Sequence, residues 1–195
     1  IENYMKNNND FLLHGNFSYN YYAEASKNKK VDIVTFDSVC FDYIAKSRQL
    51  LEDIKKEFEI ESVDITVIEY YPFWMLYGYS CAFCYKGYPL INIVDYDLRC
   101  VPLKKTTTGI LVPAYDYNML LTLIELNRAR VNKNIDLMEE KGVLVGHLIK
   151  FKRMYFGNNQ KKTILDDTPF QEFITTCHGS AANLKRETNV ERKEK

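Results

Sequence analysis

The stretch that decides the fold is Phe11–Asp37, FLLHGNFSYNYYAEASKNKKVDIVTFD. Phe11–His14 is a short apolar run that ends at Gly15, and the residues that follow have the pattern of a helix. Val31–Phe36, VDIVTF, is rich in β-branched side chains, which predicts a buried strand. We therefore expect a strand, a glycine turn, a helix and a second strand, in this order.

The glycine turn and the predicted second strand have the layout of a site for phosphate chemistry. Free backbone N–H groups at the start of a helix can bind a phosphate. Carboxylates at positions i and i+2 of the neighbouring strand share one face, and with a third acid from an adjacent strand they can hold two metal ions for phosphoryl transfer. The chain supplies Gly15, Asn16 and Asp32, but valine stands at the second acid position, Val34.

Acids that occur later in the chain can supply the third carboxylate. Asp95 and Asp97 in INIVDYDLRC are spaced i and i+2 on a predicted strand, so they share a face. The candidate metal ligands are therefore Asp32, Asp95 and Asp97, although solvent-facing acids on a hairpin strand would give the last two the same pattern. Asp37 is not expected to replace the acid missing at Val34, because its odd offset from Asp32 places it on the other face.

The rest of the sequence predicts an α/β fold, α+β in detail. Asp37 and Ser38 can cap a long amphipathic helix, and the aromatic and β-branched segments after it predict a meander of three strands with a hairpin turn at KGYP. Apolar residues return to helical spacing after Pro113. We expect a mixed sheet with helices on one face, followed by a helical extension.

The expected organisation has four parts. These are a linker at 1–10, a core at 11–112, a helical extension at 113–178 and a disordered charged tail at 179–195. The chain starts without methionine and ends in NLKRETNVERKEK, so we interpret it as a piece of a longer polypeptide.

Composition limits the partners that the chain can have. Lys plus Arg and Asp plus Glu each total 26, so no global positive field attracts nucleic acid. The best local candidate for RNA contact is HLIKFKRMYFGNNQKK, which interleaves cations with aromatic residues but would look the same as a solvated helix face. No apolar run approaches the roughly 20 residues of a membrane span, and five scattered cysteines fit a reducing compartment, the cytoplasm. The candidate RNA-binding cations are Lys150, Lys152, Arg153, Lys161 and Lys162.

The order of these features resembles the poly(A) polymerases of nucleocytoplasmic large DNA viruses, which belong to the nucleotidyltransferase superfamily. The resemblance is carried by LLHGNFSYNYY, VDIVTFD, INIVDYDLRC and GILVPAYDYNMLLTLIELNRARV, and it covers most of residues 11–180. These polymerases contain a catalytic nucleotidyltransferase domain and a second, similar half that has lost the catalytic acids. Gly15 matches the turn glycine of the superfamily, Asp32 the first acid and Asp95 the third, whereas Asn16 and Val34 depart from it as the silent half does.

The resemblance implies a non-catalytic nucleotidyltransferase-like domain in a viral poly(A) polymerase. Its role would be to bind RNA or to dimerise while a companion catalytic domain of the same polypeptide adds AMP to mRNA 3′ ends, in the host cytoplasm or the virion. No cofactor is expected on this domain, and the parent enzyme would use ATP with Mg²⁺ or Mn²⁺. Two alternatives stay open: a small divergent metal-dependent nucleotidyltransferase, and a pure interaction module whose aromatic strands form a dimer interface.

Overall fold

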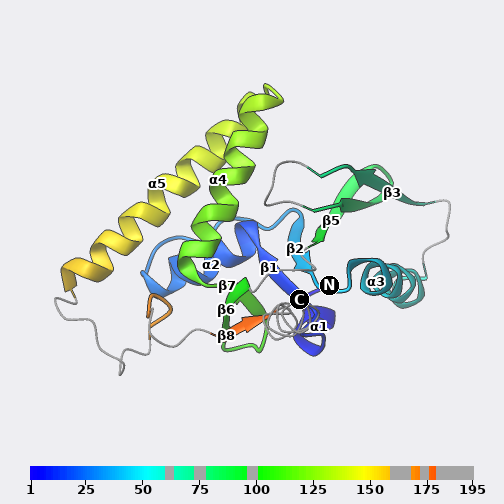
Figure 1. Cartoon of the computed structure of the whole chain (residues 1–195), viewed down its shortest axis with the longest axis horizontal. Coiled ribbons are helices and arrows are strands. Elements are labelled where there is room, and N and C mark those ends of the chain that lie inside the picture. Colours follow the sequence, from blue (N-terminus) through cyan, green and yellow to red (C-terminus); the bar gives the residue numbers. More distant parts are fainter. Residues whose placement is uncertain (60–63, 73–77, 96–100, 159–167, 172–175, 179–195) are drawn as a thin grey trace, which may run out of the picture.

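The computed structural model describes residues 1–59, 64–72, 78–95, 101–158, 168–171 and 176–178 (Figure 1). The order of helices and strands follows the sequence prediction of a mixed α/β chain that ends in long helices. The elements are α1 Glu2–Asn7, β1 Phe11–His14, α2 Gly15–Ala25, β2 Phe36–Cys40, α3 Tyr43–Glu57, β3 Ile65–Tyr70, β4 Ser80–Tyr85, β5 Tyr88–Asp95, β6 Val101–Lys105, β7 Leu111–Pro113, α4 Tyr115–Val131, α5 Ile135–Asn158 and β8 Thr176–His178.

The main sheet has five strands in the order β1-β2-β5-β4-β3. Strands β2 and β5 are parallel, and the other neighbouring pairs are antiparallel. The β4–β5 hairpin turns at Lys86 and Gly87, whose φ angles of +48° and +85° suit a two-residue turn. The predicted meander and its hairpin are therefore confirmed. A smaller antiparallel sheet has the order β7-β6-β8.

Helices cover both faces of the main sheet. Leu50 and Ile54 of α3 pack on one face, in an apolar cluster with Ile91 and Ile93 of β5. On the other face, helix α4 contributes Leu121 and its neighbour Ile124 to a second cluster. Figure 1 shows α4 and α5 side by side on one side of the molecule and α3 on the other. The predicted fold class, a mixed sheet with helices and then a helical extension, is confirmed.

The predicted strand at Val31–Phe36 is wrong, because strand β2 begins only at Phe36. Val34 is 83% exposed, and Val31 exchanges two 2.8 Å hydrogen bonds with the side chain of Asn20 in α2 instead of joining the sheet. Strand β2 pairs with β1 and β5 at once, and these long-range ladders outweigh the local preference of the β-branched residues. Asp37 is therefore a strand residue and caps no helix.

The helix that Asp37 and Ser38 were predicted to cap begins further on. Helix α3 starts at Tyr43, after Asp42, whose φ of +55° turns the chain out of the strand. The helix itself is confirmed, but its boundary lies several residues beyond the predicted one. Asp37 and Ser38 are residue types that often cap helices, but in the structure they lie in strand β2.

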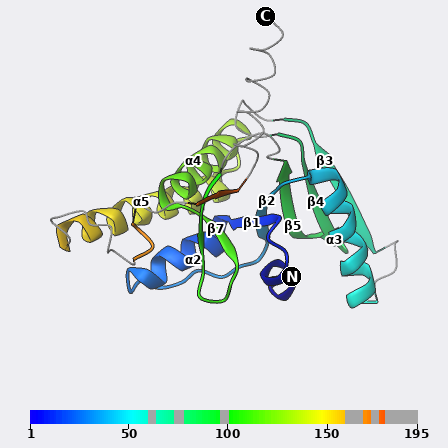
Figure 2. The same cartoon turned by 60° about the horizontal axis from the view of Figure 1, so that its bottom comes forward.

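The first ten residues are more than the linker that the sequence predicts. Helix α1 lies beneath the sheet in Figure 2, and its Met5 is 1% exposed in the apolar cluster with Phe11 and Leu13. The helical extension also returns to the core, since β8 pairs with β6. The predicted tail at 179–195 lies outside the described residues. No helix within the described ranges is long and apolar enough to cross a membrane.

Candidate functional site

Asp37 lies directly against the glycine turn at the start of helix α2. In the β1–β2 ladder it is opposite His14, the residue before Gly15. Gly15 has a φ of +61°, and a Cβ built on it would clash with Oδ2 of Asp37. Only glycine combines this backbone conformation with so close an approach. The strand acid beside the turn is therefore Asp37, and the sequence-based assignment of this position to Asp32 is wrong.

The two neighbouring positions that would carry further acids hold uncharged residues. Val39, two residues after Asp37 and on the same face of β2, is fully buried against apolar side chains that include Leu12. Asn92 of β5 is opposite Asp37 in the parallel ladder, and its amide donates a 2.8 Å hydrogen bond to Oδ1 of Asp37. Among the residues that the structure describes, one carboxylate thus faces the turn, where a two-metal site needs several.

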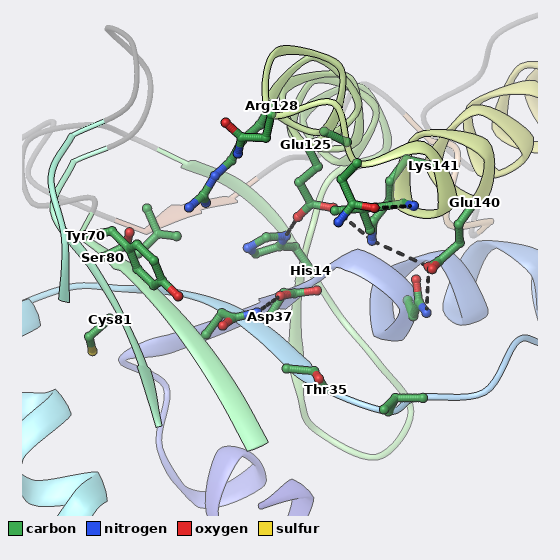
Figure 3. A pocket seen from close by; sticks show the side chains of 18 residues that line it. His14, Thr35, Asp37, Tyr70, Ser80, Cys81, Glu125, Arg128, Glu140 and Lys141 are labelled. Atoms are coloured by element: carbon green, nitrogen blue, oxygen red, sulfur yellow. Dashed lines mark hydrogen bonds and ion pairs between the residues drawn. The ribbon is translucent and has the colours of Figure 1, made fainter. Parts of the chain in front are cut away.

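Helices α4 and α5 place a buried ion pair over this part of the sheet (Figure 3). Oε2 of Glu125 lies 3.0 Å from Nζ of Lys141, and Oε1 of Glu125 lies 3.2 Å from Nδ1 of His14. The side chains of Lys141, Glu125 and His14 are 7%, 14% and 3% exposed. Nζ of Lys141 is also 3.8 Å from Oε1 of Glu140, which is half exposed. The ion pair therefore links both helices to the end of β1.

Asn16, the residue after the turn glycine, links helix α5 to the segment before β2. Its side-chain amide donates to the backbone carbonyl of Asp32 at 3.2 Å and to Oε1 of Glu140 at 3.4 Å. Asp32 contributes its carbonyl group to this contact, and the residue itself is exposed. Asn16 thus has a bonding role here that glycine, one of the two residues usual at this position, would not supply.

The charged groups in this cluster shift one another's pKa values. Burial raises the pKa of Asp37, and the carboxylate of Glu125 raises it further, against the opposite effect of His14 and Lys141. Burial would also raise the pKa of Glu125, but Lys141 and His14 hold it at about 2. Burial lowers the pKa of Lys141, and the carboxylates of Glu125 and Asp37 outweigh this, so that it is raised overall. Glu125 and Lys141 are therefore both charged at neutral pH.

The cluster lines a cavity of about 520 Å³ between the main sheet and helices α4 and α5 (Figure 3). On the sheet side it is bounded by Asp37, Asn92 and Ser80, and on the helix side by Glu125 and Lys141. The guanidinium of Arg128 also lines it and lies 5.3 Å from the ring centroid of Tyr70. Charged groups of both signs therefore line this cavity beside apolar side chains.

The metal ligands predicted from the sequence do not meet in this cavity. Asp95 is opposite Cys40 in the ladder, and its odd offset from Asn92 directs its side chain to the face that α3 covers. Asp32 is exposed in the segment before β2. Asp97 lies outside the described residues. Within the described part of the chain, no group of three His, Cys, Asp or Glu side chains is placed to hold a metal ion.

The residues around Gly15 do not fit a divalent metal ion. Mg²⁺ and Mn²⁺ require several hard oxygen ligands, and Mg²⁺ demands near-octahedral geometry. Here Oδ1 of Asp37 accepts from Asn92, Val39 offers no side-chain oxygen, and the ammonium of Lys141 neutralises Glu125. The described residues beside Gly15 therefore lack the oxygen ligands that a divalent ion needs.

The cations predicted to contact RNA fall into three groups. Lys150 and Arg153 are exposed on α5. Lys152 forms an ion pair with Asp116 and lies 4.8 Å from the ring centroid of Tyr115, so its charge is already engaged. Lys161 and Lys162 lie outside the described residues.

Sequence reasoning missed most of this cluster. It excluded Asp37, and it gave no role to Asn92, His14, Glu125 or Lys141. One signal was present in the sequence: Glu125 interrupts the apolar run LLTLIELNRA. A glutamate on the buried side of a helix is rarely found without a partner of opposite charge. The partner is 16 residues away on another helix, so the sequence pattern alone could not identify it.

The sheet order, the glycine turn on helix α2 and the strand acid beside it define a mixed α/β domain with a polar site at the start of a helix. The chain belongs to the family described as "APMV, Putative poly(A) polymerase, catalytic subunit, C-terminal", whose model matches residues 1–195.

The chain is also similar to a curated protein and, in its fold, to a solved structure. The chain is 27% identical over 211 aligned positions to the "Putative poly(A) polymerase catalytic subunit" of Acanthamoeba polyphaga mimivirus, a match that covers 93% of the chain and 36% of that protein. It superposes on the crystal structure of the Megavirus polyadenylate synthase with a TM-score of 0.82 and 24% identity, covering 98% of the chain and 40% of that structure. The chain therefore spans well under half the length of both relatives.

Proposed function

We propose that the chain is a non-catalytic nucleotidyltransferase-like domain of a viral poly(A) polymerase. In this role it supports a companion domain of the same polypeptide, which adds AMP to mRNA 3′ ends. ATP and Mg²⁺ or Mn²⁺ would bind to the companion domain. The family and the short span of the chain along its relatives support this division of labour.

The observation that carries the proposal is the set of residues at the three acid positions. Asp37 keeps the carboxylate beside the glycine turn, Val39 replaces the second acid, and Asn92 stands at the third. Phosphoryl transfer in this superfamily depends on metal ions that several carboxylates hold. A single carboxylate that is hydrogen-bonded to an amide favours a structural role for this site over a catalytic one.

The alternative of an active enzyme loses support from the same geometry. It requires Asp32, Asp95 and Asp97 to converge beside Gly15. Asp32 is exposed ahead of β2, and Asp95 faces the opposite side of the sheet. The first of these positions is instead filled by Asp37.

RNA contact remains part of the proposal, and helix α5 offers its best surface. Lys150 and Arg153 are exposed there and can track a phosphate backbone, whereas Lys152 is engaged with Asp116. Replacing Lys150 and Arg153 by glutamate in the longer polymerase should weaken RNA binding and lower the salt dependence of the affinity. The double change Arg130→Glu with Lys133→Glu, at two exposed cations near the α4–α5 turn, is the matched control for charge. Unchanged RNA affinity would remove α5 from the RNA surface.

A contact between domains or copies is also part of the proposal. Strand β3 is at the edge of the main sheet, and Val67, Ile68 and Tyr70 on it are each about 40% exposed. Exposed apolar residues on an edge strand are suited to pairing with another chain or domain. A monomeric mass of the chain in sedimentation equilibrium would exclude self-association through this edge, and would leave the companion domain as its partner.

The proposal is tested in the longer polymerase by separating the two domains genetically. Asp37→Ala in this domain should leave AMP addition to an RNA 3′ end within about twofold of wild type, because Asp37 holds no metal in the proposed role. Alanine at a metal-binding acid of the companion domain should reduce it by several orders of magnitude. A loss with Asp37→Ala as large as with the companion variant would overturn the proposal, provided that the variant remains folded by circular dichroism.

A further inference from the structure

We infer that the cavity between the main sheet and helices α4 and α5 binds a phosphate ester without a metal ion, with the anionic group held by Arg128 and Ser80. This site deepens the proposed function and rests on it, since a domain that supports AMP addition to RNA lies close to nucleotides. Its role is to hold a nucleotide, and no transfer reaction takes place in it.

Arg128 supplies a positive charge that no described acid neutralises. Glu125 lies one turn earlier on α4, but its two carboxylate oxygens are 3.2 Å from His14 and 3.0 Å from Lys141. Within the described part of the chain, the guanidinium of Arg128 forms no ion pair, and it lies over the ring of Tyr70 at 5.3 Å from the centroid. A guanidinium held against an aromatic face keeps the N–H donors on its edge for two oxygens of one anion.

Ser80 presents a second donor from the sheet. It is opposite Tyr70 in the antiparallel β3–β4 ladder, so both side chains lie on the same face of the sheet. Ser80 is 7% exposed and lines the cavity, and its hydroxyl makes no hydrogen bond among the residues that the structure describes. Buried hydroxyl groups normally have a hydrogen-bond partner. An anionic oxygen between Arg128 and Ser80 would supply it.

The rest of the cavity suits the organic part of the ester. Its volume of about 520 Å³ is far larger than a phosphate group and within the range of small-molecule sites. Figure 3 shows Arg128 and Ser80 on one side of the cavity and Asp37 nearer its middle. The amide of Asn92 donates to Asp37, and its carbonyl oxygen has no donor among the described residues.

These positions give the ligand an orientation. A carboxyl group disfavours an anion beside it, so the phosphate belongs at Arg128. The oxygens of Asp37 and Asn92 can accept hydrogen bonds from the amino group of a base. A free nucleotide and one unit of an RNA strand offer the same chemistry, and neither needs a divalent ion where a guanidinium supplies the charge.

Binding is measured by isothermal titration calorimetry on the 195-residue chain in EDTA, so that neither metal ions nor AMP transfer contribute. The probes are AMP, adenosine, inorganic phosphate and a short oligoadenylate. AMP should bind at least about tenfold more tightly than adenosine, because adenosine has no anion for the guanidinium. It should also bind more tightly than inorganic phosphate, which lacks the contacts near Asp37. Similar affinities for AMP and oligoadenylate assign a free nucleotide to the site, whereas at least about tenfold tighter binding of oligoadenylate assigns the RNA strand.

Substitutions connect the binding to the named side chains. Arg128→Gln should weaken AMP binding by at least about tenfold, and Ser80→Ala by about threefold. Arg130→Gln, at an exposed arginine of the same helix, should change neither the affinity nor the melting temperature. Arg128→Lys keeps the charge without the planar fork of donors, so its affinity should be intermediate. It replaces Arg128→Gln if that variant does not fold.

Three results would overturn the inference: no saturable binding of AMP or oligoadenylate, adenosine binding as tight as AMP binding, or a folded Arg128→Gln variant with wild-type affinity for AMP. None of them bears on AMP addition, which is measured separately in the longer polymerase. A chain that binds no nucleotide in EDTA contradicts this site alone, whereas AMP transfer that Asp37→Ala abolishes contradicts the proposed function.

Discussion

The two faces of the main sheet contrast in what they bury. Under α3 the sheet packs Ile91 and Ile93 against Leu50, in a cluster of apolar side chains. On the opposite face, beside Gly15, the sheet places Asp37 against helices that supply Glu125, Lys141 and further polar groups. The apolar face is stabilised by close packing of side chains, whereas the polar face is stable only if its buried charges are paired. The apolar face alone can therefore hold the fold, and the charged groups of the other face are not needed for the sheet to form.

The largest expected effect is on the apolar face. Leu50→Ala, at a position with no exposed surface, should lower the free energy of unfolding by about 4 kcal/mol, because it removes buried methyl groups and leaves a cavity. Ile44→Ala on the same helix, where the side chain is 64% exposed, should cost less than about 0.5 kcal/mol. Urea unfolding of the two variants measures both. Equal losses would mean that α3 does not pack as described.

The next effect tests the close approach between the turn and the acid. Gly15→Ala should cost about 3 kcal/mol, since alanine at a φ of +61° is strained and its Cβ would clash with Asp37. Gly87→Ala has a similar backbone strain at a φ of +85° with open space around the site, so it should cost about 1 kcal/mol. In the double variant Gly15→Ala with Asp37→Ala, the free energy of unfolding should be lowered by less than the sum of the two single changes. Independent, additive losses would show that Gly15 and Asp37 are not in contact.

A smaller effect is expected from acid, and it sharpens the contrast between the faces. Glu125 has a pKa of about 2 in the folded chain against an ordinary value of 4.5, so its contribution to stability is complete above pH 4.5 and is lost as the pH falls toward 2. Glu125→Gln lacks this titration. The difference in unfolding free energy between wild type and Glu125→Gln should therefore shrink by about 2 kcal/mol between pH 6 and pH 3. A difference that stays constant with pH would place Glu125 outside the ion pair.

The smallest effect is expected at Asp37 itself. Its pKa is raised by burial and by Glu125, so ionisation of Asp37 opposes folding at neutral pH and a neutral side chain avoids this cost. Asp37→Asn retains an oxygen that can accept from Asn92. It should therefore stabilise the chain at pH 7 by less than about 1 kcal/mol. A loss of about 2 kcal/mol or more would indicate that the charge of Asp37 is required structurally.

The sequence predicted the apolar parts of this molecule better than the polar ones. Strand β1, the helix after Gly15, the β4–β5 hairpin and the long C-terminal helices follow local periodicity, and the structure has them. Strand β2 was placed about five residues too early. VDIVTF has a strong local preference for a strand, whereas FDSVC becomes a strand only through its partners β1 and β5. The intrinsic strand preference of a segment does not show which other strands it will pair with.

The candidate site depended on this misplaced strand. Moving the strand from Val31–Phe36 to β2 transfers the acid position from Asp32 to Asp37 and the second position from Val34 to Val39. The inferred loss of the second acid is the same in both registers, because valine occupies each position. The ion pair between Glu125 and Lys141 arises from the packing of two helices and has no counterpart in the spacing of the sequence.

The most direct test of the central claim is to incubate the purified 195-residue chain with radiolabelled ATP, an RNA primer and either Mg²⁺ or Mn²⁺. The account predicts no extension of the RNA above the level of a reaction without protein. Metal-dependent addition of AMP that Asp37→Ala abolishes would contradict it, because the carboxylate beside Gly15 would then be part of a working active site.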